Sequence, residues 1–310
     1  MITTITLNPC IDKMVSINSF TYGGMNRVLD SEIRGSGKGI NVAIALNHLG
    51  RQAICTGINY RDKGFFVHQC LDEKGIDHDF IMVEGEVRTN YKIYDRSKQI
   101  VTELNEKGHR VKESYLELLK DKLIAHCDHS KIMVLSGSVP EGVPSSIYRE
   151  ILKSISGYPI KTILDTYGSL LLEGLKESPY IIKPNLYELE RTLDVRITSH
   201  GDIVRAAQYF IEKGVRIVCV SLGGDGAIIV DEEKAYHAPA VDIDAKGTVG
   251  AGDSMVAGFC MAIEEGLGLE DILRYGVAAA TASVMREGIL LCTREGFDYI
   301  LPKVKVKSMT

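Results

Sequence analysis

Four short apolar runs decide the fold of this chain: KIMVLSG at 131–137, KTILDT at 161–166, YIIKPN at 180–185 and VRIVCVSLG at 215–223. Each run has the composition of a buried β-strand, and helical patterns of about 10–15 residues separate them. Strands that alternate with helices form βαβ units, which build a mainly parallel sheet with helices on both faces. The sequence therefore predicts an α/β fold.

The same alternation continues towards the N-terminus. ITTITL at 2–7 and AICTGI at 53–58 predict two more strands. INVAIALNHLG at 40–50 and GFFVHQCLDEKG at 64–75 predict helices, and each ends at a glycine, as many helices do. No Pro/Ser-rich linker and no repeat interrupts the chain, so nothing in the sequence marks a domain boundary.

Two regions break this alternation, at 12–34 and 87–104. In both, polar and apolar residues alternate, and turn signals occur at Gly23-Gly24 and at Asp95-Arg96-Ser97. We expect half-exposed antiparallel strands there, outside the main sheet. A small β-lid over the carboxyl edge of the sheet would account for both insertions, and that edge is where open α/β sheets bind ligands.

The composition is that of an ordinary globular protein. The 310 residues include 36 Lys and Arg against 41 Asp and Glu, a formal net charge of −5, and 45% hydrophobic residues. A chain of this length forms one large α/β domain or two ordinary ones, and it buries about 75% of its unfolded surface. Its mild acidity would attract neither nucleic acid nor an anionic membrane, so any anionic ligand must be held by a local pocket.

The cysteines and the N-terminus indicate where the protein works. The seven cysteines form no C-x-x-C pair, and most lie in apolar runs such as VRIVCVSL, which is typical of buried thiols in a reducing compartment. MITTITLNPCIDK lacks the pattern of a signal peptide, and the apolar stretches are shorter than the roughly 20 residues that span a bilayer. We therefore expect a soluble, cytoplasmic protein.

The strongest candidate for chemistry is GTVGAGDSMVAGFCMAIEEG at 247–266. Gly250, Ala251 and Gly252 are small enough for the backbone to approach a ligand closely, and the free N–H groups of a helix start bind anions. Asp253 stands where an N-cap belongs. Its carboxylate could merely cap the helix, or it could accept a proton from a hydroxyl that attacks a phosphoryl group. These residues alone leave both functions open.

A second candidate, GSGKGIN at 35–41, fits neither of two common phosphate-binding loops. It lacks the first glycine and the Ser or Thr of a Walker A motif, and Ile40 stands where a dinucleotide fingerprint has its last glycine. A glycine turn with a lysine at a helix start could still hold a sugar or a phosphate. Alternatively, it is a tight turn that leads from the lid into a helix.

Two further segments have simple structural explanations. SLGGDG at 221–226 lies between two predicted strands and is either a plain β-turn or a glycine loop that admits a nucleotide. KPNLYELE at 183–190 ends a strand and opens a helix, and Asn185 and Glu188 have the spacing of a capping box. That capping box alone would explain both residues.

The order of these motifs is more specific than any one of them. Asn8-Pro9-x-x-Asp12, G-K-G-x-N, K-P-N-x-x-E, S-L-G-x-x-G and G-A-G-D follow one another along essentially the whole chain. In this order the sequence resembles the PfkB (ribokinase-like) carbohydrate kinases, and TLNPCIDK, the NR at 26–27, GKGIN and VRTNYKI are most similar to their hexose-phosphate branch. The resemblance implies a single kinase domain over 1–310 with a ribokinase-like three-layer α/β/α fold and a discontinuous β-lid at about 12–34 and 87–104.

The resemblance also implies a role for each motif residue. Asp253 matches the catalytic base, and Gly250, Ala251 and Gly252 match the anion hole for the transferring phosphoryl group. The sugar site would consist of Asp12, Arg27, Gly37, Lys38, Gly39, Asn41 and Arg88. The ATP site would consist of Lys183, Asn185, Glu188, Ser221, Gly223 and Gly226, with Glu188 holding Mg²⁺ through water. The chain departs from the family pattern at Ser36, which replaces a glycine, and at Gly247, which replaces a polar residue.

A phosphorylated sugar agrees with the charges of the expected lid. A phosphate group carries a charge of about −2 at pH 7, and Arg27, Lys38, Arg88 and Lys92 lie in or beside the lid. Arginine forks and a lysine point charge suit such a group. The alternative is that these side chains are solvated charges of the lid, and we expect this of Lys92 more than of Arg88.

The resemblance thus implies an ATP- and Mg²⁺-dependent kinase that converts a ketohexose monophosphate into a bisphosphate. TNYKI at 89–93 is more similar to the family members that act on fructose 1-phosphate than to those that act on tagatose 6-phosphate, so the resemblance favours fructose 1-phosphate as the substrate. A kinase of an unphosphorylated sugar and a catalytically silent sugar-phosphate sensor are further alternatives, whereas a dehydrogenase would need the missing dinucleotide fingerprint. Antiparallel lid strands would leave exposed edges, so we also expect a homodimer that forms through the lid.

Overall fold

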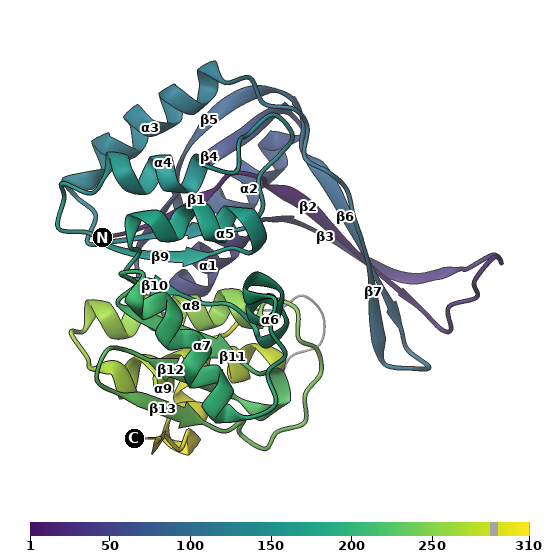
Figure 1. The fold of residues 1–310 in the computed structure, drawn as a ribbon. Helices are drawn as coiled ribbons and strands as arrows, with labels where there is room; N and C mark the ends of the chain where they lie inside the picture. The colour runs from purple at the N-terminus through teal and green to yellow at the C-terminus, as the bar shows by residue number, and fades with distance from the viewer. Residues whose placement is uncertain (286–290, 310) are drawn as a thin grey trace.

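The computed structural model describes residues 1–285 and 291–309 as a large sheet with helices, from which a small sheet projects (Figure 1). Within these residues the large sheet has ten strands in the order β14-β13-β12-β11-β10-β9-β8-β1-β4-β5. Neighbouring strands from β5 to β11 run parallel, and those from β11 to β14 run antiparallel. The predicted α/β fold with a mainly parallel sheet is therefore confirmed.

The elements follow the predicted alternation. The strands of the large sheet are β1 (Ile2–Thr6), β4 (Ala53–Asp62), β5 (Asp77–Glu86), β8 (Ile132–Ser136), β9 (Lys161–Asp165), β10 (Ile181–Ile182), β11 (Ile217–Ser221), β12 (Ala227–Val230), β13 (Ala235–Ala238) and β14 (Lys307–Ser308). The helices are α1 (Lys38–His48), α2 (Gly64–Asp72), α3 (Ser114–Cys127), α4 (Ile147–Ser154), α5 (Gly168–Gly174), α6 (Leu186–Leu193), α7 (His200–Glu212), α8 (Ala251–Glu264), α9 (Leu269–Val284) and α10 (Arg294–Ile300). Among the described helices, none combines the length and the apolar character that crossing a bilayer requires.

Helices cover both faces of the large sheet. Every residue of β1 and of β8 is buried, and a strand can be buried throughout only if both of its faces are covered. On one side α3 packs against α4 and α4 against α5, whereas on the other α8 packs against α1 and α9. The sheet and these two groups of helices form the three layers that the resemblance implies.

The small sheet, called the lid sheet below, consists of two hairpins. Its strands are β2 (Cys10–Ile17), β3 (Val28–Ser36), β6 (Arg88–Asp95) and β7 (Ile100–Asn105), in the order β3-β2-β6-β7. Each hairpin is antiparallel, as predicted, but the central strands β2 and β6 pair in parallel. The reason is that β2 and β6 follow directly after β1 and β5, which are themselves parallel strands of the large sheet.

A close helix crossing holds α8 in place. A Cβ atom added at Gly258 of α8 would lie 2.5 Å from the backbone oxygen of Tyr275 in α9. Only glycine therefore allows the two helix backbones to approach this closely, since backbone atoms cannot move aside as a flexible side chain can. The crossing fixes the position of α8, whose first turn carries Asp253.

We predict that Gly258→Ala lowers the free energy of unfolding by up to about 2 kcal/mol. Alanine should gain about 1 kcal/mol in helix propensity, but the overpacking should cost about 1–3 kcal/mol. Denaturant unfolding would measure the change. Gly201→Ala is the matched control, because Gly201 also lies in a helix and the nearest atom to its added Cβ, at 3.6 Å, belongs to an arginine side chain. A Gly258→Ala protein as stable as the Gly201→Ala protein would contradict the prediction.

Candidate active site

The carboxyl ends of the parallel strands open into a cleft of about 1190 Å³. Thr6, Ser136, Lys183 and Ser221, which end or follow four of these strands, lie in its wall. The lid sheet, the starts of α1 and α8, and α9 contribute further walls. The cleft thus lies at the sheet edge at which the sequence predicts a ligand.

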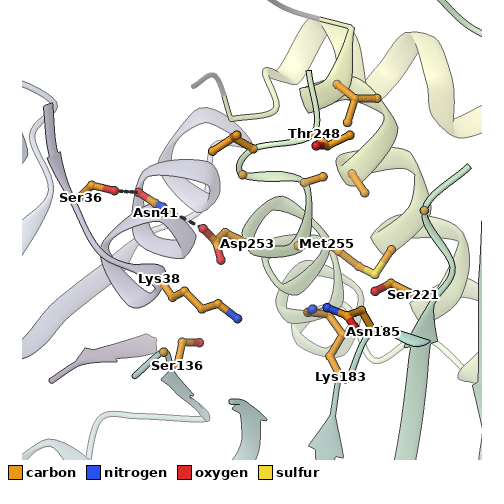
Figure 2. A pocket seen from close by; sticks show the side chains of 18 of the residues that line it. Ser36, Lys38, Asn41, Ser136, Lys183, Asn185, Ser221, Thr248, Asp253 and Met255 are labelled. Atoms are coloured by element: carbon orange, nitrogen blue, oxygen red, sulfur yellow. Dashed lines mark hydrogen bonds between the residues drawn. The ribbon is translucent and has the colours of Figure 1, made fainter. Parts of the chain in front are cut away.

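The cleft brings together most of the predicted site residues, although they are far apart in the sequence. Asp12, Gly37, Lys38, Asn41, Arg88, Lys183, Asn185, Glu188, Ser221, Gly223, Gly226, Gly250, Ala251, Gly252 and Asp253 line it. Figure 2 shows Lys38 from α1 pointing into the space between Asp253 and Lys183.

Two predicted residues, Arg27 and Gly39, do not line the cleft. Arg27 is exposed in the segment that joins β2 to β3, at the far end of the lid sheet. Gly39 lies in the first turn of α1 and faces β1, where an added Cβ would be 2.6 Å from the backbone oxygen of Ile5. Gly39 thus lets α1 pack closely onto β1, and this close packing carries Lys38 and Asn41 into the cleft.

The interpretation of Asp253 as an N-cap is wrong. The N-cap of α8 is Gly250, and the carboxylate of Asp253 makes no capping bond to the helix start. Gly250 adopts a left-handed conformation with φ of 87°, which lets the helix begin at Ala251 and puts Asp253 in its first turn. No side chain caps this start. The N–H group of Ala251 donates to the backbone oxygen of Thr248 at 3.3 Å, and within the described residues those of Gly250, Gly252 and Asp253 remain available to an anion.

Hydrogen bonds orient the carboxylate of Asp253 towards the cleft. The amide of Asn41 donates to Asp253 Oδ2 at 2.8 Å, and the hydroxyl of Ser36 donates to Asn41 Oδ1 at 3.1 Å (Figure 2). Ser36, which departs from the family pattern, thus fixes which end of the Asn41 amide faces Asp253. Burial raises the pKa of Asp253 to about 6, with Lys38 opposing this shift and Asp165 adding to it.

Below the cleft, Asp165 pairs with two lysines. Lys38 Nζ lies 3.1 Å from Asp165 Oδ2, and Lys183 Nζ lies 3.4 Å from Asp165 Oδ1. Burial alone would raise the pKa of Asp165, but the charges of Lys183 and Lys38 outweigh it and hold the pKa below its usual value. The sequence reasoning missed Asp165, although its place at the end of the predicted strand KTILDT could have indicated it.

The lid sheet turns a polar face to the cleft. Lys92 Nζ lies 2.9 Å from Asp12 Oδ2, and Asn90 donates to Asp12 Oδ1 at 3.2 Å. Lys92 is only 6% exposed, so its interpretation as a solvated lid charge is wrong. Asp12, Asn90 and Lys92 occupy alternate or paired positions of β2 and β6 and therefore share one face.

Arg88 stands at the base of the lid sheet, where backbone oxygens surround its guanidinium. Its guanidinium donates to the backbone oxygens of Asn8 and Glu106, and within residues 1–285 and 291–309 no carboxylate pairs with it. Its buried Nε has no hydrogen-bond partner there either. A cation that is compensated only by carbonyl dipoles favours an anionic ligand.

The other end of the cleft could hold a nucleotide. Asn185 and Glu188 form the predicted capping box at the start of α6. SLGGDG forms the turn between the antiparallel strands β11 and β12, so it is both a turn and a wall of the cleft. Val241, Ile243, Val277, Ala280 and Val284 add an apolar wall that suits a planar base. The sequence reasoning missed these residues because they look like ordinary core residues.

The site suits a magnesium ion that is held mainly by phosphate and water. Among the described residues, no group of three or more His, Cys, Asp or Glu side chains could enclose a metal. Glu188 lines the cleft, and its Oε2 accepts from the backbone N–H of Asn185. Its other oxygen could bind a water of a Mg²⁺ ion, which usually keeps several waters and takes its protein ligands from one or two carboxylates.

Comparisons with known proteins show which family this chain is similar to. The model of the pfkB family carbohydrate kinases matches residues 5–295. A 1-phosphofructokinase from Borreliella burgdorferi is 34% identical over 310 residues, which are 100% of this chain and 99% of that protein. A tagatose-6-phosphate kinase from Staphylococcus epidermidis is 30% identical over 309 residues, 99% of each protein. Phosphofructokinase-2 from Escherichia coli has a TM-score of 0.92 at 28% identity, covering 97% of this chain and 98% of that one.

We predict that Asp253→Asn stabilises the protein by about 1–3 kcal/mol at pH 8. Since folding raises the pKa of Asp253 from 3.8 to about 6, the ionised carboxylate destabilises the folded state. This cost is absent below about pH 4, grows between about pH 4 and 6, and is complete above that range. Denaturant unfolding at several pH values would therefore show a difference between the two proteins that grows as the pH rises.

Asp165→Asn is the control of opposite sign. Its two lysines hold the pKa of Asp165 below the usual value, so the ionised form stabilises the folded state at neutral pH, and the asparagine variant should be less stable than wild type. If Asp253→Asn lowered the stability at pH 8 as well, Asp253 would not be a destabilising buried charge.

Proposed function

Because the chain belongs to the pfkB family of carbohydrate kinases, we propose that it transfers the γ-phosphoryl group of ATP to fructose 1-phosphate and forms fructose 1,6-bisphosphate. The observation that carries this proposal is the position of Asp253. Its buried carboxylate, with a pKa raised to about 6, opens onto a cleft with polar lid residues at one end and the glycine loop of β11–β12 at the other. Relatives named 1-phosphofructokinase along the full length support the choice of sugar.

Asp253 would act as the general base. With a pKa of about 6 it is ionised at neutral pH, yet it is basic enough to accept a proton from the attacking hydroxyl. The amide of Asn41 would keep the accepting oxygen in place. At the start of α8, the N–H groups of Gly250, Gly252 and Asp253 would bind the oxygens of the phosphoryl group as it is transferred, whereas that of Ala251 already donates to Thr248 O.

A phosphate already present on the sugar would satisfy the cations of the lid end. Lys92 and Asp12 neutralise each other, whereas Arg88 pairs with no carboxylate among the described residues, and Lys38 shares the single carboxylate of Asp165 with Lys183. An arginine fork binds a phosphate through two parallel hydrogen bonds. A neutral sugar would leave Arg88 without an anion, so this arrangement favours a sugar phosphate over a free sugar.

ATP would bind along Lys183, Asn185, Ser221, Gly223 and Gly226. Magnesium, held through water by Glu188, would neutralise charge on the β- and γ-phosphates. The two lysines above Asp165 would approach the same phosphates. The lid sheet would exclude water from the reacting groups, since water competes with the sugar hydroxyl as an acceptor.

We also propose that two copies form a homodimer through their lid sheets, within one kinase domain over 1–310 whose lid comes from about 12–34 and 87–104. The face of the lid sheet opposite Asp12 carries Ile33, Tyr91 and Leu104, which are 49%, 38% and 55% exposed. Such apolar side chains next to unpaired strand edges favour a partner surface. Arg27 lies at the far end of this sheet, where a partner would bring it near a second cleft.

The buried, unbridged thiols of Cys55, Cys219 and Cys260 favour a cytoplasmic location.

We predict that ADP release from ATP will be fastest with fructose 1-phosphate among four acceptors: fructose 1-phosphate, tagatose 6-phosphate, fructose 6-phosphate and free fructose. A coupled assay would measure kcat/KM for each. Asp253→Asn should lower kcat by about 10²–10⁴ through loss of the base, while calorimetry should show ATP binding close to that of wild type.

The same assay separates the alternatives. Preference for tagatose 6-phosphate would change the substrate but keep the mechanism, and preference for free fructose would refute the role given to Arg88. No ADP release with any acceptor would favour a sugar-phosphate sensor. Near-normal turnover by Asp253→Asn would refute its role as the base.

We predict that the wild-type protein is a dimer by light scattering at micromolar concentration. The double variant Ile33→Asp/Leu104→Asp should weaken dimerisation by at least about tenfold, because an interface would bury two unpaired carboxylates. Leu172→Asp is the matched control, since Leu172 is a leucine of similar exposure on α5, outside the lid sheet. A monomeric wild type would contradict the prediction, as would a dimer that only Leu172→Asp disrupts.

A further inference from the structure

A single carboxylate below the cleft, Asp165, holds two ammonium groups. It ends strand β9 and is 1% exposed, and each of its oxygens faces a different lysine. A carboxylate buried this deeply is tolerated only when opposite charges compensate it. Within the described residues, Lys38 and Lys183 are its ion-pair partners.

The two lysines reach Asp165 from opposite ends of the cleft. Lys38 begins α1, directly after lid strand β3, and therefore belongs to the sugar end. Lys183 follows β10 and precedes the capping box of α6, at the nucleotide end. An added Cβ at Gly252 would lie 3.3 Å from Lys183 Nζ, so this ammonium group lies against the first turn of α8. Both lysines thus stand beside the helix start that carries Asp253.

We propose that Asp165 is a positioning residue that holds Lys38 and Lys183 on its two oxygens, so that both ammonium groups face the phosphoryl group as it passes from nucleotide to sugar. This inference rests on the proposed kinase function. Asp165 itself does not line the cleft, so it acts through the lysines.

Unused polar capacity at this place points to a ligand. The Lys183 contact is an ion pair at 3.4 Å, longer than a strong charged hydrogen bond, so the ammonium group keeps donors for a phosphate. Ser136 lies opposite Asp165 in the register of β8 and β9 and lines the cleft, and its hydroxyl is buried without a hydrogen-bond partner in the described part of the chain. A purely structural ion cluster would have no use for unsatisfied groups, since each one destabilises the fold.

Asp165 also influences the base. The titratable groups that face Asp253 are Lys38 on α1, Lys183 after β10 and Asp165 on β9, and Asn41 adds a neutral donor. Burial raises the pKa of Asp253 most, the two lysines lower it, and the charge of Asp165 raises it further. Without the charge of Asp165, both lysines would be free to turn towards Asp253 and stabilise its ionised form. Asp165 therefore keeps the lysines available for phosphate and keeps Asp253 basic.

The test begins with Asp165→Asn in the full-length protein. We expect kcat/KM for the sugar phosphate to fall about 10²-fold, the usual effect of misplacing reacting groups by about 1 Å. In wild type, the acidic limb of the pH profile should lie near the pKa of Asp253, about 6. In Asp165→Asn this limb should move to lower pH. A merely structural role would lower stability and rate but leave the limb in place, and that result would overturn the proposal.

Two further variants keep the test decisive if Asp165→Asn folds poorly. Asp165→Glu retains the negative charge but displaces it. We therefore expect a lower kcat/KM, with the acidic limb of the pH profile at the same pH as in wild type. Asp165→Asn combined with Lys183→Met should lose little more than the worse single variant, because both changes disable one unit. If the decreases in kcat/KM of the two single variants multiplied fully in the double variant, the proposal would be overturned. Asp79→Asn is the matched control, since Asp79 pairs with Lys122 away from the cleft and should leave rate and limb unchanged.

A binding measurement separates this inference from the proposed function. Calorimetry with a non-hydrolysable ATP analogue requires no turnover, and Asp165→Asn should weaken binding of the analogue about tenfold through the displaced Lys183. If wild type phosphorylates no sugar but shows this difference in binding, the proposed function fails and the positioning role stands. If both proteins bind the analogue equally well, the positioning role is refuted whatever the activity.

Discussion

Compensation of buried charge is the constraint on which the rest of the cleft depends. Asp165, Lys38 and Lys183 come from three different elements, and the buried carboxylate of Asp165 is tolerated only because the two lysines compensate its charge. Their meeting requires β9 and β10 to be neighbours in the parallel sheet and α1 to begin at the same edge. The order of the strands, the start of α1 and the electrostatics of Asp253 are therefore linked by a single cluster of charges.

The two faces of the lid sheet follow from the alternation of side chains along a strand. Its row Asp12–Asn90 faces the cleft, and the next row, Lys13–Tyr91, faces away. A polar and an apolar face thus arise from adjacent positions of the same strands. One face supplies the ion pair of Lys92 and Asp12, and the other exposes Ile33 and Leu104. The half-exposed pattern that marks these strands in the sequence has this origin.

Local patterns predicted the elements well and long-range contacts poorly. The strand–helix alternation, both lid insertions and the capping box of Asn185 and Glu188 depend on neighbours in sequence, and the structure contains all of them. Asp165 was missed as a site residue because its importance depends on the ion pair with Lys38, which is 127 residues away in the sequence. The parallel pairing of β2 with β6 was missed because it depends on the common direction of β1 and β5 in the large sheet. The sequence suggested Asp253 as the N-cap of α8, whereas the N-cap is Gly250, three residues earlier. Nothing in the sequence except the glycine itself indicates the left-handed conformation that starts the helix there.

The short connections of the lid sheet have a mechanical consequence. β2 begins four residues after β1 ends, β6 begins two residues after β5 ends, and β3 ends two residues before α1 begins. These three links are too short to be flexible tethers, although α3 begins nine residues after β7 ends, and the lid sheet extends from them as an arm (Figure 1). A small rotation about these links would sweep the far end through a wide arc while shifting Asp12, Arg88 and Lys38 together by a small amount. A large movement at the far end of the lid sheet would thus correspond to only a small shift of the residues around the reacting groups.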